Sequence, residues 1–191
     1  GSARYGRKCL VRGTVTSKEG SFRGSIEFVL EDTEGRLQCY EYQVLAEPSG
    51  DGSFSAVLPM HCYFLSVSVR LKDTNGKVLT EREIPLKRLN IGTGSVIGIL
   101  GDGQKSEYHY LSSFGCNVFY LSPEDVANRS EGLDFFDILI LDGYKKGDLD
   151  DAQLTAIKEW VAAGGTLSVG TGTAGEGTLR ALKDAEIYRG E

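Results

Sequence analysis

The sequence predicts two joined folds: an antiparallel β-sandwich over residues 1–92, and then an α/β domain built on a parallel sheet over residues 93–191. Up to about residue 90, short runs of alternating apolar and polar residues are separated by turn residues, and no helical period interrupts them. After that point, apolar runs of four to six residues alternate with helical stretches, which is typical of β-α-β units.

Charge divides the chain at the same place. Residues 1–92 hold 13 Lys+Arg against 11 Asp+Glu, a balance of +2, whereas residues 93–191 hold 8 against 16, a balance of −8. Because nucleic-acid binding needs a basic surface, this pattern argues against such a partner. No stretch approaches the roughly 18 apolar residues of a membrane helix. Gly1-Ser2 is typical of residues left by cloning, so a leader or anchor could have been removed before it.

The first half is predicted to form a series of short strands. Val67, Val69 and Leu71 alternate with polar residues, which is the period of a sheet with one solvated face. Asn75-Gly76 is typical of a tight hairpin turn. Six or seven short antiparallel strands over about 90 residues predict an immunoglobulin-like sandwich. The expected strands are Cys9–Ser17, Gly24–Asp32, Leu37–Ala46, Ser53–Pro59, Tyr63–Asp73 and Val78–Leu86.

The four cysteines, Cys9, Cys39, Cys62 and Cys116, form no C-x-x-C pair and have no histidine cluster to complete a zinc site. Cys39 and Cys62 fall in expected strands that could face one another across the sandwich. The sequence leaves open whether a disulfide joins them. The interpretation we favour is that all four cysteines are small buried residues of the core.

In the second half the expected parallel strands are Ser95–Leu100, Asn117–Leu121, Asp137–Leu141 and Thr166–Val169. The clearest helix is Asp151–Ala163, because Asp150 and Gln153 can form a capping box at its start and Gly164 can end it. A third helix is expected at Thr178–Ala185. Four parallel strands are one fewer than a flavodoxin-like sheet usually has, so we expect this domain to be incomplete and the chain to be part of a longer protein.

The run DILILDGYKKGDLDDAQLTAIKEWVAAGGTLSVGTG, at Asp137–Gly172, resembles the class I glutamine amidotransferase-like fold. It is most similar to the inactive form found in large bacterial membrane-associated proteins, where a β-sandwich often precedes it. The similarity covers about residues 95–180. Active amidotransferases of this fold carry a nucleophilic Cys in a G-x-C-x-G turn. The corresponding turn here, Gly170–Ala174, contains no Cys, so the resemblance implies a domain without amidotransferase activity and without a cofactor.

A ligand crevice is expected at the carboxyl ends of the parallel strands, where the strand order of a doubly wound sheet reverses. Two acids at neighbouring strand ends, Asp102 and Asp142, could hold a magnesium ion. The other interpretation is that both acids cap turns and stay solvated. The candidate residues are Gly101, Asp102, Gly103, Asp142, Gly143, Tyr144, Thr171 and Gly172.

From the resemblance we expect a non-catalytic extracytoplasmic module of a larger bacterial envelope protein, which binds an unidentified protein or small molecule and reaches the membrane only through segments outside this chain. A cytoplasmic location is the alternative. Two other functions stay open: a magnesium-binding phospho-acceptor domain using Asp102 and Asp142, and a hydrolase or transferase completed by residues beyond Glu191. An anion resting on the amides of Gly170-x-Gly172-x-x-Gly175 is a further possibility.

Overall fold

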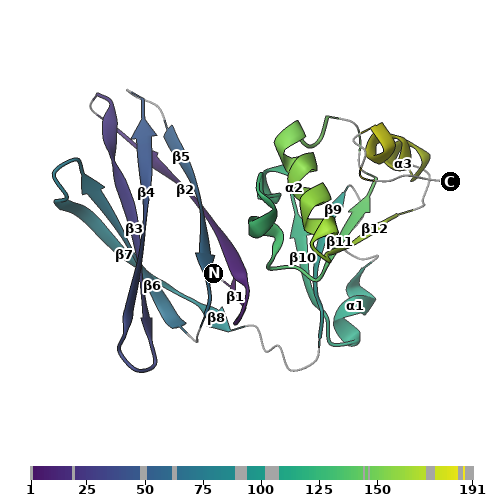
Figure 1. The fold of residues 1–191 in the computed structure, drawn as a ribbon, viewed down its shortest axis with the longest axis horizontal. Coiled ribbons are helices and arrows are strands. Elements are labelled where there is room, and N and C mark those ends of the chain that lie inside the picture. The colour runs from purple at the N-terminus through teal and green to yellow at the C-terminus, as the bar shows by residue number, and fades with distance from the viewer. Residues whose placement is uncertain are drawn as a thin grey trace. The chain divides into compact units, whose positions relative to one another are not determined.

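The computed structural model describes residues 2–18, 20–47, 51–61, 64–88, 94–101, 108–143, 145, 147–170, 175–184 and 187. Its internal contacts divide the chain into two compact units, Gly1–Leu89 and Asn90–Glu191, which we call the β unit and the α/β unit. Figure 1 shows antiparallel strands in the first and a mixed set of strands and helices in the second.

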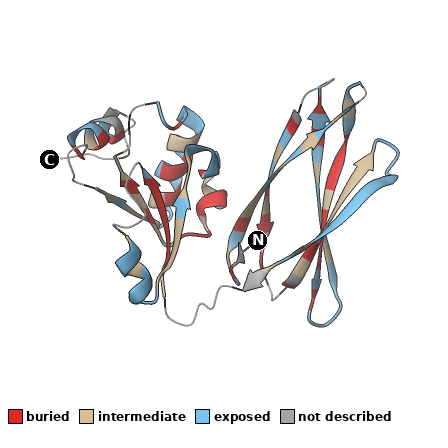
Figure 2. Cartoon of the chain, turned by 180° about the vertical axis from the view of Figure 1, so that it is seen from behind, coloured by how far each residue is buried: buried red, intermediate tan, exposed pale blue. Residues whose placement is uncertain are grey.

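The larger sheet of the β unit has four antiparallel strands in the order β4-β3-β6-β7. Ile26, Phe28 and Leu30 alternate along one face of the central strand β3 and are almost fully buried there. By contrast, β7 is a sheet edge and is exposed along most of its length (Figure 2). The strands are β3 (Phe22–Asp32), β4 (Leu37–Ala46), β6 (Phe64–Asp73) and β7 (Val78–Pro85).

A second antiparallel sheet pairs β2 (Lys8–Thr16) with β5 (Asp51–Pro59) and packs on the first. The ring of Phe28, from β3, lies 6.1 Å from the ring of Phe54, from β5. Tyr42, from β4, donates its hydroxyl proton to the Val57 carbonyl of β5 at 2.9 Å. The expected antiparallel strands are therefore confirmed, each within two residues at either end. Two short parallel strands, β1 (Ser2–Ala3) and β8 (Lys87–Arg88), also pair in this unit.

The cysteines differ from the expectation of four buried residues. Cys9 is buried, as expected, but Cys39 is exposed and Cys116 is half-buried, and none of these three is in a disulfide. Cys39 faces outward because it pairs with Val29, on the side of β3 opposite to Phe28. Cys62 lies outside the described residues, but because Cys39 is free, the disulfide between Cys39 and Cys62 that the sequence left open is not formed.

Two hairpin loops of the β unit share one construction. In each, an aspartate ends a strand and its Oδ1 accepts two backbone N–H groups: those of Glu34 and Arg36 at Asp32, and those of Asn75 and Lys77 at Asp73. A glycine follows in the left-handed region, with φ of 78° at Gly35 and 80° at Gly76. The loops thus hold three residues between paired positions, one more than the two-residue turn that Asn-Gly suggests.

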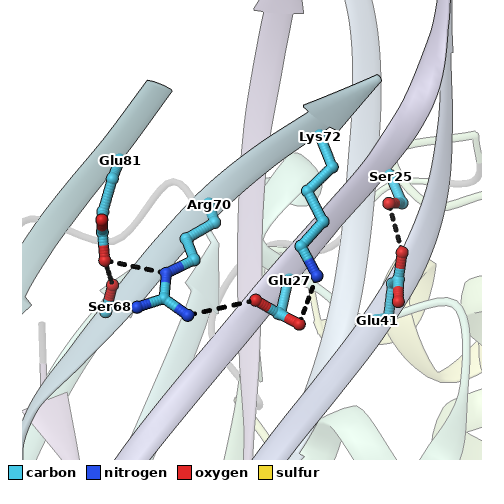
Figure 3. Close-up of polar contacts among 7 residues, drawn as sticks. All are labelled: Ser25, Glu27, Glu41, Ser68, Arg70, Lys72 and Glu81. Atoms are coloured by element: carbon cyan, nitrogen blue, oxygen red, sulfur yellow. Dashed lines mark hydrogen bonds and ion pairs between the residues drawn. The ribbon is translucent and has the colours of Figure 1, made fainter. Parts of the chain in front are cut away.

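Charged side chains form a connected row across the outer face of the larger sheet (Figure 3). Glu27 of β3 accepts hydrogen bonds from two cations of β6, Lys72 and Arg70, the second at 3.4 Å. Arg70 also donates to Glu81 of β7 at 2.9 Å, and Glu81 accepts from the Ser68 hydroxyl. The hydrogen bond from Lys72 is the main cause that lowers the pKa of Glu27 below its ordinary value.

The α/β unit contains a four-stranded parallel sheet in the order β10-β9-β11-β12, as expected from the apolar runs. From the inner strand β9 the chain first reaches β10 on one side and then crosses to β11 and β12 on the other. The strand order therefore reverses between β9 and β11. The strands are β9 (Val96–Gly101), β10 (Asn117–Leu121), β11 (Ile138–Asp142) and β12 (Thr166–Val169).

One face of this sheet packs on a cluster of three phenylalanines. The ring of Phe119, from β10, lies 5.3 Å from Phe135 and 6.2 Å from Phe136, which precede β11. Gly98 of β9 leaves room for this packing, because a Cβ there would come within 3.1 Å of the Phe136 ring. The chain between β10 and β11 includes two 3₁₀ turns, η1 (Pro123–Asp125) and η2 (Ser130–Leu133).

The helices are α1 (His109–Ser113), α2 (Asp151–Ala162) and α3 (Gly175–Asp184). The predicted capping box of α2 is confirmed: Asp150 accepts from the Gln153 amide at 2.8 Å, and Gln153 accepts from the Asp150 amide at 3.0 Å. Gly164, with φ of 106°, follows the helix end as expected. The helix α3 begins three residues earlier than predicted, because the glycines in its first turn hide the helical repeat of apolar residues. Among the described residues, no helix combines the length and apolar character that crossing a bilayer requires.

Candidate functional site

The carboxyl edge of the parallel sheet brings two of the predicted residues side by side. Gly101 ends β9 and is paired in register with Asp142, which ends β11. These are the two strands between which the strand order reverses, and in doubly wound sheets this is the place where a crevice opens. Gly101 has no room for a side chain, because a Cβ would collide with the Asp142 carbonyl.

The Asp142 carboxylate is held in a defined position at this edge. Its Oδ2 accepts a hydrogen bond of 2.8 Å from the hydroxyl of Tyr108, which lies directly before α1. Its Oδ1 lies against Gly170, which follows β12, and a Cβ at Gly170 would collide with this oxygen. The Gly170 amide in turn donates to the Leu141 carbonyl at 2.8 Å, so β12 is tied to β11 directly below the carboxylate.

The structure describes three of the eight candidate site residues. Gly101, Asp142 and Gly143 come together at the strand ends, and Gly143 turns the chain away from β11 with φ of 72°. The other five lie outside the described residues, and so does the pairing of Asp102 with Asp142 that a magnesium site would need. These five are Asp102, Gly103, Tyr144, Thr171 and Gly172.

In the part of the chain that the structure describes, no three His, Cys, Asp or Glu side chains gather in a way that could hold a metal ion. Cys116 lies directly before β10, so it is at the amino edge of the sheet and away from Asp142. His61 and His109 are both exposed, and they belong to different units.

Sequence reasoning missed two residues of this site, Tyr108 and Gly170. Tyr108 lies 34 positions before its partner Asp142, and no local pattern marks it as a ligand of that carboxylate. A signal for Gly170 did exist, because a glycine at the end of a strand can mark a close approach of another backbone or a side chain. The sequence instead predicts a turn at Gly170–Ala174.

A separate open groove of about 460 Å³ runs between η2 and the start of α2 in the α/β unit. Arg129, Glu131, Asp151 and Glu159 contribute charged side chains to it. Ser130 donates its hydroxyl proton to Glu159 across the groove at 3.1 Å. None of these residues was predicted as a site.

Comparisons with known proteins do not identify the chain. No family model and no curated protein matches its sequence. Among solved structures it is similar to a cycloisomaltooligosaccharide glucanotransferase of Paenibacillus sp. complexed with cycloisomaltoheptaose, with 10% sequence identity over 88% of this chain and a TM-score of 0.34. The chain spans about a quarter of that protein's length, 26%. A similarity of this size carries no argument about function.

Proposed function

We propose that this chain is a non-catalytic binding or assembly module of a larger bacterial membrane-associated protein, and that it acts on the extracytoplasmic side of the membrane. In this proposal the β unit is an immunoglobulin-like sandwich that serves as a spacer or contact surface. The α/β unit is a flavodoxin-like domain of the class I glutamine amidotransferase-like group. The reversal of strand order between β9 and β11 and the run at Asp137–Gly172 support this assignment.

The observation that carries the non-catalytic part is the chemistry at the carboxyl edge of the parallel sheet. The run Gly170–Ala174, which follows β12 in the sequence and corresponds to the G-x-C-x-G turn of active amidotransferases, contains no Cys. Cys116 is the only cysteine after Cys62 in the sequence, and it lies at the opposite edge. Asp142 is bonded to the weakly acidic hydroxyl of Tyr108 rather than to a histidine. An acid held by a phenol supports binding better than activation of a nucleophile.

Catalysis is tested with the purified chain and with the longer protein that contains it. Both are incubated with L-glutamine and with a panel of simple amides and esters, and the release of ammonia, acid or alcohol is measured. We expect no release above that of a heat-denatured sample. Turnover by either protein that is lost in Asp142→Asn or Cys116→Ser would overturn the non-catalytic part.

The side of the membrane can be tested through Cys39, which is exposed on the outer face of β4 and is not in a disulfide. A membrane-impermeant maleimide is added to intact spheroplasts of the bacterium that encodes the protein. We expect labelling before lysis, and a loss of most of that labelling in Cys39→Ser. Labelling that appears only after lysis would place the chain in the cytoplasm.

A further inference from the structure

The inner face of the larger sheet, which carries Phe28, is covered on one side only. The second sheet lies on β3 and β4, through the contact of Phe54 with Phe28 and the hydrogen bond from Tyr42. Along the row of paired residues that begins at Phe28, burial falls from strand to strand: Phe28 is fully buried, Val69 of β6 is half-buried and Arg82 of β7 is exposed. The sandwich therefore ends at β7 in an edge that is open to solvent (Figure 2).

The part of β7 that could pair with a further strand is short. The strand order of the larger sheet ends at β7, and this strand is exposed at every residue except the half-buried Ile84. A bulge at Leu71–Lys72 interrupts its pairing at one end, and Pro85 has no N–H to donate at the other. Thr80–Ile84 form the regular part of the edge, where the backbone N–H and C=O groups that point away from β6 can pair with a strand of another chain.

Charges alternate across the outer face up to this edge. Glu27 of β3, Arg70 of β6 and Glu81 of β7 lie opposite one another in register, and each neighbouring pair is an ion pair (Figure 3). The row ends in Glu81, whose side chain is 49% exposed, and Glu83 lies on the same face two residues further along β7. Because opposite charges on neighbouring strands stabilise a sheet, the outer face favours cations opposite both acids on a further strand.

The inner side of the same edge has the opposite charge. Arg82 lies in register with Val69 and therefore faces inward, with Thr80 and Ile84 on either side of it along the same face. A further strand is stabilised by an acid opposite Arg82 and by an apolar residue beside Ile84, which removes part of that side chain from water. The edge thus fits a strand with the order apolar, basic, acidic, basic, apolar.

The same charges disfavour a second copy of this chain as the added strand. A symmetric antiparallel pair of two β7 strands can be centred on Glu81, Arg82 or Glu83. Each of these three registers places a glutamate of one copy opposite a glutamate of the other. Like charges directly opposite one another destabilise a sheet, so the edge disfavours its own copies and favours a partner of complementary charge.

We propose that the edge of β7 at Thr80–Ile84 binds an extended segment of another protein, which adds a strand to the larger sheet and carries an acidic residue between two basic residues. The acidic residue pairs with Arg82, and the two basic residues pair with Glu81 and Glu83. The proposal rests on the proposed function and deepens it, since it identifies which part of the β unit is the contact surface and what kind of partner fits it.

The test uses the whole chain, labelled with ¹⁵N, and short peptides with blocked ends at low ionic strength. The matched peptide, Thr-Val-Lys-Glu-Lys-Val-Thr, has the complementary pattern, and the reversed peptide, Thr-Val-Glu-Lys-Glu-Val-Thr, has the charge order of β7 itself. We expect the matched peptide to shift the amide resonances of Thr80–Ile84 and to slow their hydrogen exchange. The reversed peptide should bind at least about tenfold more weakly, because three pairs of opposite charge become pairs of like charge.

Two variants separate the proposal from a general charge effect. Arg82→Glu reverses the inward charge of the edge and should weaken binding of the matched peptide by about three- to tenfold. A peptide with lysine at its centre should bind this variant more tightly than the native chain, which a folding defect would not produce. Arg23→Glu makes the same change of net charge at an exposed position of β3 and should change binding by less than about twofold. The spectra also show whether each variant is folded.

The proposal is overturned if the matched peptide leaves the β7 amides unmoved, since the charges would then only protect the edge, or if the reversed peptide binds as tightly. It is also overturned if these amides shift with the concentration of the chain alone and sedimentation shows a dimer, because a second copy would then be the occupant. A failure of the proposed function would appear separately, as turnover in the assays for ammonia, acid or alcohol, which this binding measurement does not include.

Discussion

Glu27 lies between two cations on the outer face of the larger sheet, and its side chain is only 13% exposed. Glu27→Gln removes the charge that Lys72 and Arg70 share and leaves both cations with a weaker partner. We expect this variant to lower the free energy of unfolding of the β unit by about 1 kcal/mol, at the upper end for a partly exposed ion pair. Urea denaturation followed by circular dichroism measures the change.

The matched control is Glu31→Gln, which lies on the same strand and the same face but is exposed. It should change stability by less than about 0.5 kcal/mol, as surface substitutions usually do. If both variants cost the same, the row of charges in Figure 3 contributes nothing specific to stability.

Three carboxylates of the β unit make its stability depend on pH. The pKa of Glu27 is lowered mainly by the hydrogen bond from Lys72, that of Asp32 by the backbone N–H of Arg36, and that of Glu81 by the Ser68 hydroxyl. Because each folded pKa is lower than the unfolded one, the unfolded chain binds protons more readily at acid pH. The stabilisation is therefore complete above the ordinary values of 3.8 for Asp and 4.5 for Glu, and is lost as the pH falls through the folded pKa values.

The corresponding experiment measures the free energy of unfolding of the β unit at pH 7, 6, 5, 4 and 3. We expect these groups to add no slope between pH 7 and 6 and a decline that begins below about pH 5. Glu27→Gln should decline less steeply than the native chain. An unchanged acid slope in this variant would show that Glu27 is not one of the groups responsible.

At the scale of elements, the start of α2 depends on one reciprocal pair. Asp150→Ala removes the acceptor for the Gln153 amide, and caps of this type contribute about 0.5–2 kcal/mol. Asp151→Ala, at the first exposed residue of the helix, keeps the cap and should cost less. The free energy of unfolding of the α/β unit, followed by the fluorescence of Trp160, distinguishes them. Equal losses would mean that charge near the helix start matters and the cap does not.

Most elements could be predicted from the sequence because their patterns are local. Alternation in β6 and the capping box of α2 each need fewer than a dozen residues to be recognised. The sidedness of Cys39 could also have been inferred, since it shares its face of β4 with Glu41 and Gln43 rather than with the partly buried Tyr40 and Tyr42. The prediction that Cys39 is buried disregards this alternation and is wrong.

The site was predicted only in part. One of its residues is marked by its neighbours in the sequence, whereas the other reaches the site through a contact between residues far apart in the sequence. Asp142 could be found since it is the last residue of β11 and directly follows the apolar run of that strand. Tyr108 could not, because it meets Asp142 only after the chain has crossed the sheet. Its role depends on the relative positions of two elements, which no pattern of neighbouring residues encodes.

At the scale of the whole molecule, each unit has its own core. Phe28 is fully buried in the β unit and Ile157 is fully buried in the α/β unit. We expect Phe28→Ala to destabilise only the β unit, by about 3–5 kcal/mol, and Ile157→Ala only the α/β unit, by about 2–5 kcal/mol. Far-ultraviolet circular dichroism reports both units, whereas Trp160 is the only tryptophan and reports the second.

The two readouts are followed together during urea unfolding of the whole chain. In Phe28→Ala, the transition seen by Trp160 fluorescence should stay in place while part of the dichroism signal is lost at lower urea. A shift of both transitions by the same amount in either variant would mean that the two units unfold as one.

The pairing of β2 with β5 affects how the chain emerges during synthesis. The ladder between them joins Lys8 to Pro59 and Thr16 to Asp51. In the sequence, the whole β3–β4 hairpin lies between these two strands. The hairpin can close as soon as Ala46 has left the ribosome, but β2 must wait for β5, and the larger sheet must wait longer still for β6 and β7. During that interval β2 has no partner, and Cys9 and its apolar neighbours are open to chaperones. A ribosome that pauses shortly after Pro59 would therefore lengthen the stage at which this protein is most easily misassembled.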